Sequence, residues 1–517
     1  KGKDFWVTFP PNYHNNKFNP SDRLKYGDSL YLFIVADVPT NGTIVYRDSL
    51  GLEYTHNFAI TNPAEVYTFK VSYYNFELVG FNDSGLNFSR NQSERVAKQS
   101  FHITSDNEIV VYGHSQAVTT SDAFMIFPTD ILGNDYLIMA YSSDTEVGGT
   151  SMTPSQFAVV ATEDSTLVQI DAITSTYAHG FGLQEVTLNK GEVYLVQASV
   201  MGAIYNSDLT GSSVQSSKPI AVFAGHQRAT VPVRVGNGNP SRDFLISQIP
   251  PIRTWGKNYF ITPFVQPTDI TNIGSDLFRI LAAYNLTEVS INGQVVAILN
   301  KGEFYEGALT NSAYITANSP ILVGQFKKTS QSNSLQDRSG DPFFVVIPPK
   351  EQFMTSYKVM NTQAYQFNNF YYEKVYTEHY ITLIVPASAR NEMNLDGTNV
   401  QANLFQRISN SDYYYANIPV SEGQHSVSSI TEFGIIVYGY GYANSYGYVG
   451  GLSFKPHDFK SPKIISNIDC YEINGIITDS SIYDSGVISI NVPESEKVNC
   501  DVEISNFAQF QKVILFS

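Results

Sequence analysis

The sequence has 517 residues, of which 15% are charged and 43% hydrophobic, and its formal net charge is −16. This length exceeds one ordinary domain, so the chain should form more than one packed core. The longest cationic run is Lys327-Lys328, which excludes the concentrated positive charge that nucleic-acid binding requires. No apolar run approaches the roughly 18 residues that cross a bilayer, so we expect a chain that does not span a membrane.

Four apolar segments of alternating β-forming residues run into glycine and recur along the chain. They cover 108–114, 219–226, 320–325 and 434–440, and their isoleucines are Ile109, Ile220, Ile321 and Ile435. This regularity indicates duplication of one unit. No stretch with a period of 3.6 residues supports a long helix.

A second pattern follows each of the first three segments. It reads Pro128-x-x-x-Leu132-Gly133-x-x-Tyr136, Pro251-x-x-x-Trp255-Gly256-x-x-Tyr259 and Pro349-x-x-x-Phe353-Met354-x-x-Tyr357. Proline lacks a backbone donor and stops a strand, and glycine permits a left-handed turn into the next one. The large apolar residue should fill a seam between elements, so we predict that Trp255 is buried and that Trp255→Ala costs about 3–5 kcal/mol.

A third pattern alternates apolar and polar residues in the middle of each unit. It covers 165–171, 286–293 and 393–398, and it ends in Asp171, Asn292-Gly293 or Asp396-Gly397. Asn, Asp and Gly tolerate positive φ, so the pattern predicts hairpins. Lys190-Gly191-Glu192 and Lys301-Gly302-Glu303, and more loosely Glu422-Gly423-Gln424, precede further aromatic-rich strands.

These patterns predict an all-β protein of four tandem repeat units of roughly 100–115 residues, each β-sandwich-like with about eight strands. The predicted units are 1–121, 122–240, 241–340 and 341–457, and 458–517 would begin a further Ig-like β module. The alternative architecture is a β-propeller with two blades per unit.

The two cysteines, Cys470 and Cys500, both lie in this last module. A disulfide between them would contribute about 3–4 kcal/mol, and two buried free thiols are the alternative. The sequence begins at Lys1 rather than Met, and 511–517 reads as an interrupted strand. We therefore expect a processed piece of a longer, secreted polypeptide.

Taken in order, the strands resemble the amino-terminal domain of the IgGFc-binding protein family. The resemblance covers residues 1–457 and rests on Asp4-Phe5-Trp6, Phe157-Ala158-Val159-Val160-Ala161, Pro219-Ile220-Ala221-Val222, Thr254-Trp255-Gly256-x-x-Tyr259 and Phe344-Val345-Val346-Ile347-Pro348. It implies a secreted or surface-displayed recognition module with no known catalysis. The family name refers to the attachment of one animal member to antibody Fc, and that partner is not carried over. The Asn-, Tyr- and Ser-rich composition is similar to that of Bacteroidota-type surface adhesins.

Catalytic and metal-binding patterns are weak in this sequence. It has neither a G-x-S-x-G elbow nor a defined carboxylate pair, and its nine histidines lack zinc spacing, so we expect no enzyme and no cofactor. The segments 337–341 and 82–85 could supply oxygen ligands to calcium, but surface turns are the favoured interpretation. His114 and His226 follow glycine at equivalent positions, and we interpret both as side chains that hydrogen-bond a turn.

Tyrosine clusters are the binding candidates, and they comprise Tyr371, Tyr372, Tyr413, Tyr414, Tyr415, Tyr440 and Tyr442. Alternation along a strand places one set outside, where flat amphipathic rings suit glycan or protein contacts. Cross-strand packing inside the sheet is the alternative. We predict an extracellular adhesion module that binds a glycan or protein on another surface. A structural spacer without its own ligand is the second hypothesis, and a glycan-active enzyme is the third.

Overall fold

The computed structural model describes residues 1–14, 28–81, 90–143, 153–200, 207–233, 241–267, 276–329, 340–368 and 371–454, together with four strands between 463 and 516. The chain forms two compact units, one of Lys1–Ile252 with Gly256–Ser453 and one of Arg253–Trp255 with Phe454–Ser517. The regular elements are nearly all strands, which confirms the all-β prediction. No helix in the described ranges is long and apolar enough to span a membrane.

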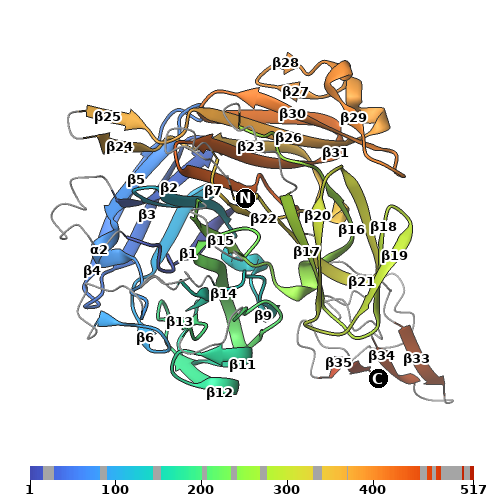
Figure 1. The fold of residues 1–517 in the computed structure, drawn as a ribbon. Coiled ribbons are helices and arrows are strands. Elements are labelled where there is room, and N and C mark those ends of the chain that lie inside the picture. Colours follow the sequence, from blue (N-terminus) through green and yellow to red (C-terminus); the bar gives the residue numbers. More distant parts are fainter. Residues whose placement is uncertain are drawn as a thin grey trace. The chain divides into compact units, whose positions relative to one another are not determined.

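The first unit holds four antiparallel sheets that share one strand order (Figure 1). A long strand lies at the centre of each sheet, and these strands are β7 (Phe101–Ala117), β14 (Ser213–Ala229), β21 (Ala313–Phe326) and β31 (Gly423–Gly441). Each contains one of the four isoleucines that revealed the duplication. We refer to the four sheets as repeats 1 to 4.

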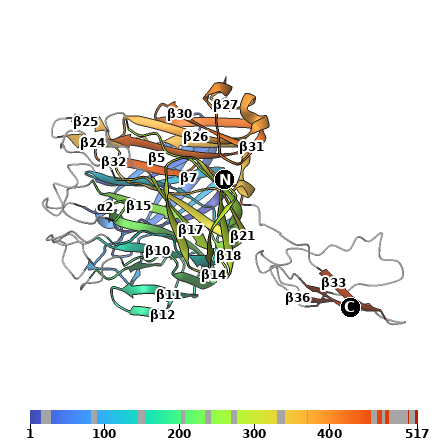
Figure 2. The same ribbon diagram turned by 45° about the vertical axis from the view of Figure 1, so that its right-hand side comes forward.

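Repeats 1 and 2 occupy the amino-terminal half of the chain. The other elements of repeat 1 are β1 (Gly2–Val7), β2 (Ser29–Ala36), β3 (Thr40–Arg47), β4 (Glu53–Ile60), β5 (Tyr67–Ser72), α2 (Tyr73–Phe76) and β8 (Thr120–Ile126). Those of repeat 2 are β6 (Val96–Ala97), η2 (Thr129–Ile131), β9 (Gly133–Leu137), β10 (Ser155–Ala161), β11 (Thr166–Thr176), β12 (Gly180–Leu188), β13 (Val193–Gln197) and β15 (Asp243–Gln248). Figure 2 shows the β11–β12 hairpin at the outer end of repeat 2.

Repeats 3 and 4 follow the same plan. The other elements of repeat 3 are η3 (Ile252–Thr254), β16 (Gly256–Ile261), β17 (Asp276–Ala282), β18 (Thr287–Ile291), β19 (Gln294–Leu299), β20 (Phe304–Leu309) and β22 (Phe344–Val346). Those of repeat 4 are η4 (Lys350–Gln352), β23 (Met354–Asn361), β26 (Glu378–Pro386), η5 (Ala387–Asn391), β27 (Asn394–Leu395), β28 (Thr398–Asn399), η6 (Ala402–Leu404), β29 (Gln406–Arg407), β30 (Tyr413–Val420) and β32 (Asn444–Val449), with a separate hairpin of β24 (Tyr365–Asn368) and β25 (Tyr371–Lys374).

Each long strand changes partners along its length and so joins two half-sheets. In repeat 2, β14 pairs with β11 up to Ser216 and with β10 from Ile220 onward, and Pro219 lies at the change. Proline is tolerated there because its missing N–H falls where the ladder is interrupted. Side chains of both halves share one core in repeat 3, including Ile315 and Val323 of β21. The continuous sheet with a shared core agrees with the predicted sandwich-like repeats.

The proline and tyrosine motif connects each repeat to the next. The 3-10 helices η2, η3 and η4 follow its prolines, and Leu132, Trp255 and Phe353 are buried as predicted. The Tyr259 hydroxyl accepts a hydrogen bond from Gly256 N–H and donates one to the Ile321 carbonyl. Tyr136 and Tyr357 repeat this arrangement in repeats 2 and 4. The tyrosine therefore fastens the start of each sheet to the bend of its long strand.

The role predicted for the motif glycine is wrong. Gly256 is absent from the described residues with positive φ, so it makes no left-handed turn. A Cβ atom on Gly256 would lie 2.4 Å from Cβ of Pro349, the motif proline of the next repeat. Gly2 meets Pro128 in the same way, at 2.3 Å. Glycine is required because the following proline packs directly on its backbone.

The pattern forms a hairpin at all three sites, and the turn lies where it was predicted at two of them. Asn292 and Gly293 join β18 to β19, and Asp396 and Gly397 join β27 to β28, all with positive φ. At the third site β11 continues through Asp171 to Thr176, and its partner β12 begins only at Gly180. Gly423 opens β31 rather than preceding an edge strand as Gly191 and Gly302 do.

The four repeats close into a ring, because repeat 4 contacts repeat 1. Strands β8, β15, β22 and β32, one from each repeat, contact one another at its centre. The buried Asp122 carboxylate of β8 accepts hydrogen bonds from the N–H groups of Ile246, Phe344 and Gly447, one in each of the other repeats. Burial raises the pKa of Asp122 well above its usual value, against the effect of these hydrogen bonds. One side chain thus connects all four repeats.

The sheets end slightly later than the predicted repeat boundaries. The predicted ends at residues 121, 240 and 340 precede or cut β8, β15 and β22, which pair with the long strand of the preceding sheet. In the second unit, β33 (Lys463–Ile468), β34 (Ile473–Thr478), β35 (Ile504–Ser505) and β36 (Val513–Phe516) form a four-stranded sheet. Cys470 and Cys500 lie outside the described residues, so their disulfide stays a prediction.

Candidate functional site

Strand β30 presents its three tyrosines to opposite sides of the sheet of repeat 4. Tyr413 is half-buried and stacks on Phe260 of repeat 3, with ring centroids 4.2 Å apart. Tyr414 faces the other side, where the Arg390 guanidinium lies 4.2 Å from its ring centroid. Tyr415 is half-buried and donates a hydrogen bond to Oε1 of Gln406, at 3.1 Å. The alternation predicted for this cluster is therefore present.

The remaining tyrosine candidates do not join this group. Tyr440 is fully buried and its hydroxyl donates to the Val265 carbonyl at 2.8 Å, so the prediction that it is displayed to a ligand is wrong. Cross-strand packing, the alternative, accounts for it. Tyr442 is 51% exposed in the turn before β32. The backbones of Tyr371 and Tyr372 lie in β25, and their side chains fall outside what the structure describes.

Tyr415 lines an open groove of about 610 Å³ between repeats 3 and 4. The groove combines aromatic and aliphatic side chains with amide, hydroxyl and guanidinium groups. Its lining residues in repeat 3 are Phe278, Ile291, Asn292, Val296, Tyr305, Gly307, Ala308, Leu309, Thr310, Asn311, Ser312 and Ala313, and those in repeat 4 are Gln406, Arg407, Ser409 and Tyr415. Its accessible lining is more polar than apolar, so the groove offers hydrogen-bonding groups beside aromatic rings.

Polar groups at the repeat 4 side of the groove come from β29 and the turn after it. Arg407 is the one charged residue among the lining residues, and its side chain is 61% exposed. Asn410 Nδ2 donates to the Asn292 carbonyl at 2.6 Å, which holds this turn against repeat 3. The groove therefore has a fixed wall and one accessible cation.

A second, polar pocket of about 340 Å³ lies between repeats 1 and 2. Arg47 and Glu53 form an ion pair at its wall, with Nη2 and Oε2 2.9 Å apart. The indole of Trp6 stacks on His102 at 4.1 Å, and a Cβ atom on Gly191 would lie 3.1 Å from the same indole. Because Trp6 is covered in this way, the pocket offers no open aromatic face to a ligand.

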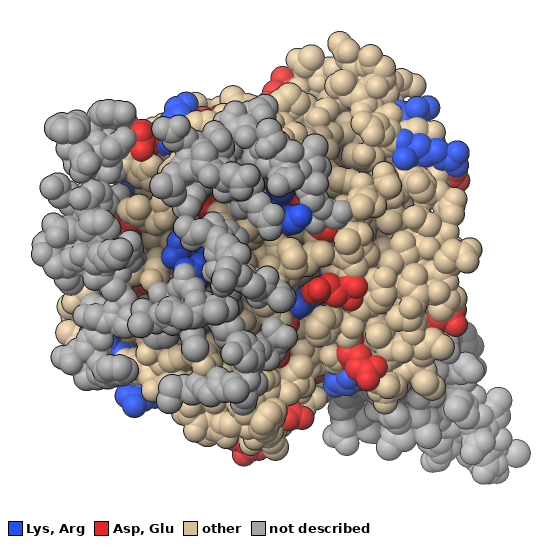
Figure 3. Space-filling view, in the orientation of Figure 1, with Lys and Arg blue, Asp and Glu red and all other residues tan. Residues whose placement is uncertain are grey.

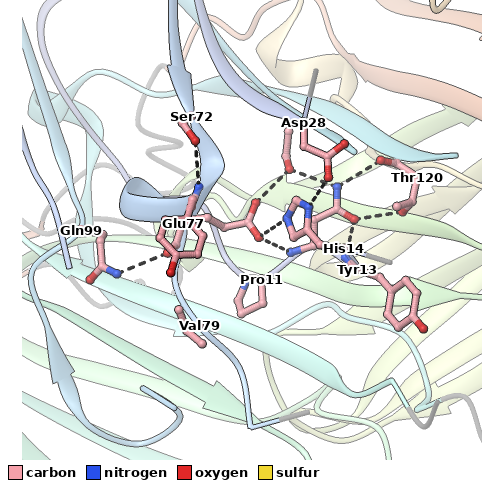
Figure 4. Close-up of polar contacts among 12 residues, drawn as sticks. Pro11, Tyr13, His14, Asp28, Ser72, Glu77, Val79, Gln99 and Thr120 are labelled. Carbon is pink, nitrogen blue, oxygen red and sulfur yellow. Dashed lines mark hydrogen bonds and ion pairs between the residues drawn. The ribbon is translucent and has the colours of Figure 1, made fainter. Parts of the chain in front are cut away.

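A cluster of ionisable side chains is buried in repeat 1 (Figure 4). His14 Nδ1 lies 2.8 Å from Asp28 Oδ2, and Nε2 lies 2.9 Å from Glu77 Oε1. Burial alone would lower the pKa of His14, but the charge of Glu77 and the hydrogen bonds to both carboxylates raise it to about 10. A protonated histidine with both nitrogens bound between two carboxylates neutralises buried charge and has no free nitrogen for catalysis.

A second buried charge joins repeats 2 and 3. The Arg279 side chain is 3% exposed and lies 2.8 Å from Asp208 of repeat 2 and 2.8 Å from Glu306 of β20. Its guanidinium centre is 4.6 Å from the ring centroids of Tyr141 and of Phe304. Arginine suits this position because its planar group pairs with carboxylates and stacks on rings at the same time. This seam is closed, whereas the seam between repeats 3 and 4 is open.

His114 and His226, the two equivalent histidines, are fully buried. His114 Nε2 lies 2.8 Å from the Tyr376 hydroxyl, and His226 Nδ1 accepts a hydrogen bond from the N–H of Arg228 at 3.0 Å. Burial lowers the pKa of each imidazole to about 3, so both are neutral. The local backbone contact of His226 agrees with the predicted turn bond, whereas His114 bonds a side chain of repeat 4 instead of a turn.

The described residues contain no group of three or more His, Cys, Asp or Glu side chains arranged to hold a metal ion. Of the two calcium candidates, 82–85 and 337–339 lie outside the described residues. The Asp341 carbonyl accepts a hydrogen bond from Ser445 Oγ at 2.6 Å. On the face shown in Figure 3, the coloured Lys and Arg side chains are scattered among uncharged residues. No cationic surface gathers there for nucleic acid.

The residues that sequence reasoning missed are those that only the fold brings together. Gln406 and Arg407 belong to no repeated pattern, whereas Tyr305 lies in the aromatic-rich strand that follows Lys301-Gly302-Glu303, at the position of Tyr194 in repeat 2. Arg279 lies in a strand whose other residues are mostly apolar. An arginine within the apolar run of β17 was the available signal, because a buried strand rarely carries an unpaired charge.

The chain matches known proteins over the ring. Residues 122–439 match the model of the family described as IgGFc binding protein, so repeat 1, which was expected to match, lies before the matched range. The human IgGFc-binding protein is 24% identical over 357 residues, which cover 66% of this chain and 6% of the human protein. The chain thus spans a small part of that relative. With more than half of its residues in the family match, the chain belongs to the IgGFc-binding protein family.

Proposed function

We propose that this chain is a recognition module of a longer extracellular protein, and that it binds a protein or glycan partner without catalysing a reaction. The observation that carries the proposal is the groove between repeats 3 and 4, because it is open, partly aromatic and held by a closed ring. The family supports protein binding, and the human relative is named for binding IgG Fc. Attachment of one surface to another would follow from such binding.

Tyr415 and Tyr305 are the side chains on which we expect recognition to depend most. Both are half-buried in the groove, so they are rigid while one face stays available to a partner. Aromatic anchors of this kind dominate binding energy at interfaces and stack on sugar rings. Tyr413 and Tyr440 are expected to contribute through packing, since their rings lie against other side chains.

The test is binding of the full chain to glycan and protein arrays that include IgG Fc. Tyr415→Ser should abolish reproducible array signals, whereas Tyr442→Ser, which changes an exposed tyrosine that does not line the groove, should leave them unchanged. Equal binding by both variants would move the site away from the groove. Silence of the unmodified chain on every array would favour the spacer hypothesis. Hydrolysis of an arrayed glycan would contradict the absence of catalysis.

A further inference from the structure

We propose that β20 of repeat 3 is a docking edge, to which an extended peptide segment of a partner protein adds as an antiparallel strand beside the groove. This inference rests on the proposed function, because the same groove is used. It goes further by naming the class of partner and the groups that bind it, which are the backbone N–H and C=O groups of one edge strand.

The equivalent edge strands in repeats 2 and 4 are already covered by short strands of this chain. In repeat 2, β6 pairs antiparallel with β13, joining Val96 to Tyr194. In repeat 4, β29 pairs with β30, joining Gln406 to Tyr415. Two copies of one edge thus accept a short added strand, which shows that the geometry of this edge permits such pairing.

The three edges correspond residue by residue. Ala161 N–H donates to the Glu192 carbonyl at 3.1 Å, Ala282 N–H to the Glu303 carbonyl at 3.0 Å, and Ala387 N–H to the Asp412 carbonyl at 2.8 Å. Backbone groups alternate between the two sides of a strand. The carbonyls three residues after Glu192, Glu303 and Asp412 therefore point outward, and they are those of Leu195, Glu306 and Tyr415.

The outward groups are covered in repeat 2 and bare in repeat 3. Glu94 N–H donates to the Leu195 carbonyl at 2.7 Å, and Leu195 is fully buried beneath the added segment. By contrast, β20 ends its sheet, no described strand pairs with its outer side, and both Glu306 and Ala308 are exposed. An edge of this kind is a template for another strand unless a protein protects it.

Repeat 1 shows what a protected edge looks like in the same fold. Its edge strand β5 also ends a sheet, but Lys70 is exposed on it, and a charged lysine on an edge opposes strand addition. Strand β20 carries no lysine, and the charge of its Glu306 is paired with Arg279 at 2.8 Å. Of these four edges, β20 is the one that is both uncovered and without a protecting cation in the described chain.

The groove specifies the chemistry of the added segment. Gly307, Ala308 and Leu309 line it, so side chains of a strand beside β20 would alternate into a space bounded by Phe278 and Tyr415. Side chains that combine an apolar body with a hydroxyl or amide group fit these walls at alternate positions, because the accessible lining is more polar than apolar. Arg407, the one charged lining residue, lies 3.7 Å from the exposed Asp412 and would exchange this contact for a carboxylate near one end of the segment. The site is continuous with the interface of repeats 3 and 4.

The experiment selects peptides from a phage-displayed random library on the full chain and measures their affinity for variants of β20. Ala308→Pro removes an outward N–H without adding bulk to the inner ladder, and it should weaken binding about tenfold or more. Ala308→Ser, the matched control, keeps the N–H and should leave affinity unchanged. Selected peptides should alternate side chains of the kind that fits the groove and carry one acidic residue. Replacing that acidic residue should weaken binding to the unmodified chain but not to Arg407→Gln.

A second series keeps the inference testable if Ala308→Pro fails to fold. N-methylation at alternate amides of a selected peptide should weaken its binding to the unmodified chain about tenfold, and methylation of the intervening amides should not. Strand addition would be overturned if N-methylation weakened binding equally at all positions. It would also be overturned if every selected peptide bound Ala308→Pro as tightly as the unmodified chain. Slow hydrogen exchange of the Glu306 and Ala308 amides in the free chain would show that another part of the chain already pairs with this edge, and would overturn the proposal. Self-association through β20 would show that a second copy occupies it, with the same consequence.

The array experiment separates this inference from the proposed function. Array binding that Tyr415→Ser abolishes but Ala308→Pro retains would leave the recognition function standing and overturn strand addition alone. Absence of any array binding, together with peptides that depend on β20 amides, would remove the wider function and keep the docking edge.

Discussion

The two seams that meet at repeat 3 are built from the same repeated elements and differ in what they enclose. Between repeats 2 and 3, Arg279 is buried among carboxylates and rings, and Gly302 approaches the backbone of Gly211 so closely that a Cβ atom on Gly302 would lie 2.9 Å from the Gly211 carbonyl oxygen. Between repeats 3 and 4, aromatic and amide groups face an open groove. The comparison teaches that one repeat can be anchored on one side and remain available on the other.

The largest expected effect comes from breaking the closed seam. Arg279→Met should lower the free energy of unfolding by about 3–5 kcal/mol, because it leaves the Asp208 carboxylate buried without its partner. Urea unfolding followed by fluorescence measures this loss. Arg407→Met in the open seam is the control, and its exposed position predicts a change within about 0.5 kcal/mol. Similar losses in both variants would erase the distinction between the seams.

A pH titration extends the comparison to the buried charge of repeat 1. The pKa of His14 is raised to about 10 in the folded chain, above the roughly 6.5 of an unfolded histidine. Its stabilising contribution is complete below about pH 6.5 and is lost as pH rises towards 10, at up to about 1.4 kcal/mol per pH unit. Unfolding of His14→Gln should show a smaller decline over this window. Parallel curves for the two proteins would contradict the assignment.

Removing one hydroxyl tests the junction between repeats 2 and 3 more gently. Tyr259→Phe keeps the ring but leaves the Ile321 carbonyl and Gly256 N–H without this partner, so it should cost about 1–3 kcal/mol. Denaturant unfolding gives the value, and Tyr442→Phe at an exposed site serves as the reference. A neutral Tyr259→Phe would show that the repeated tyrosine matters for packing alone.

The smallest effect on stability is expected in the groove. Tyr415→Ser should lower the free energy of unfolding by about 1 kcal/mol, because the ring is only partly buried against the core and its one described hydrogen bond is to Gln406. The same substitution should remove array binding. A loss of stability as large as that of Arg279→Met would mean that Tyr415 holds the four repeats together rather than binding a ligand. The two seams would then both be structural.

The repeats were predictable because duplicated backbone needs duplicated side chains. The motif proline and tyrosine recur at fixed spacing because each makes a contact that every copy needs. Pro349 packs on the backbone of Gly256, and the Tyr259 hydroxyl donates to the Ile321 carbonyl at the bend of the long strand. The groove was not predictable beyond Tyr415, because Tyr305 and Arg407 are far apart in sequence and meet only when two repeats dock. Tyr440 was misplaced because alternation does not say which side of a strand faces the core.

Asp122 has a consequence for how proteins of this kind can grow. Its carboxylate accepts hydrogen bonds from one strand in each of the other three repeats, so the number of repeats in the ring is fixed by geometry at four. A stacked array can gain or lose a unit at its ends because each unit contacts only its neighbours. Inserting or deleting a single repeat here would open the ring and leave a buried carboxylate short of donors.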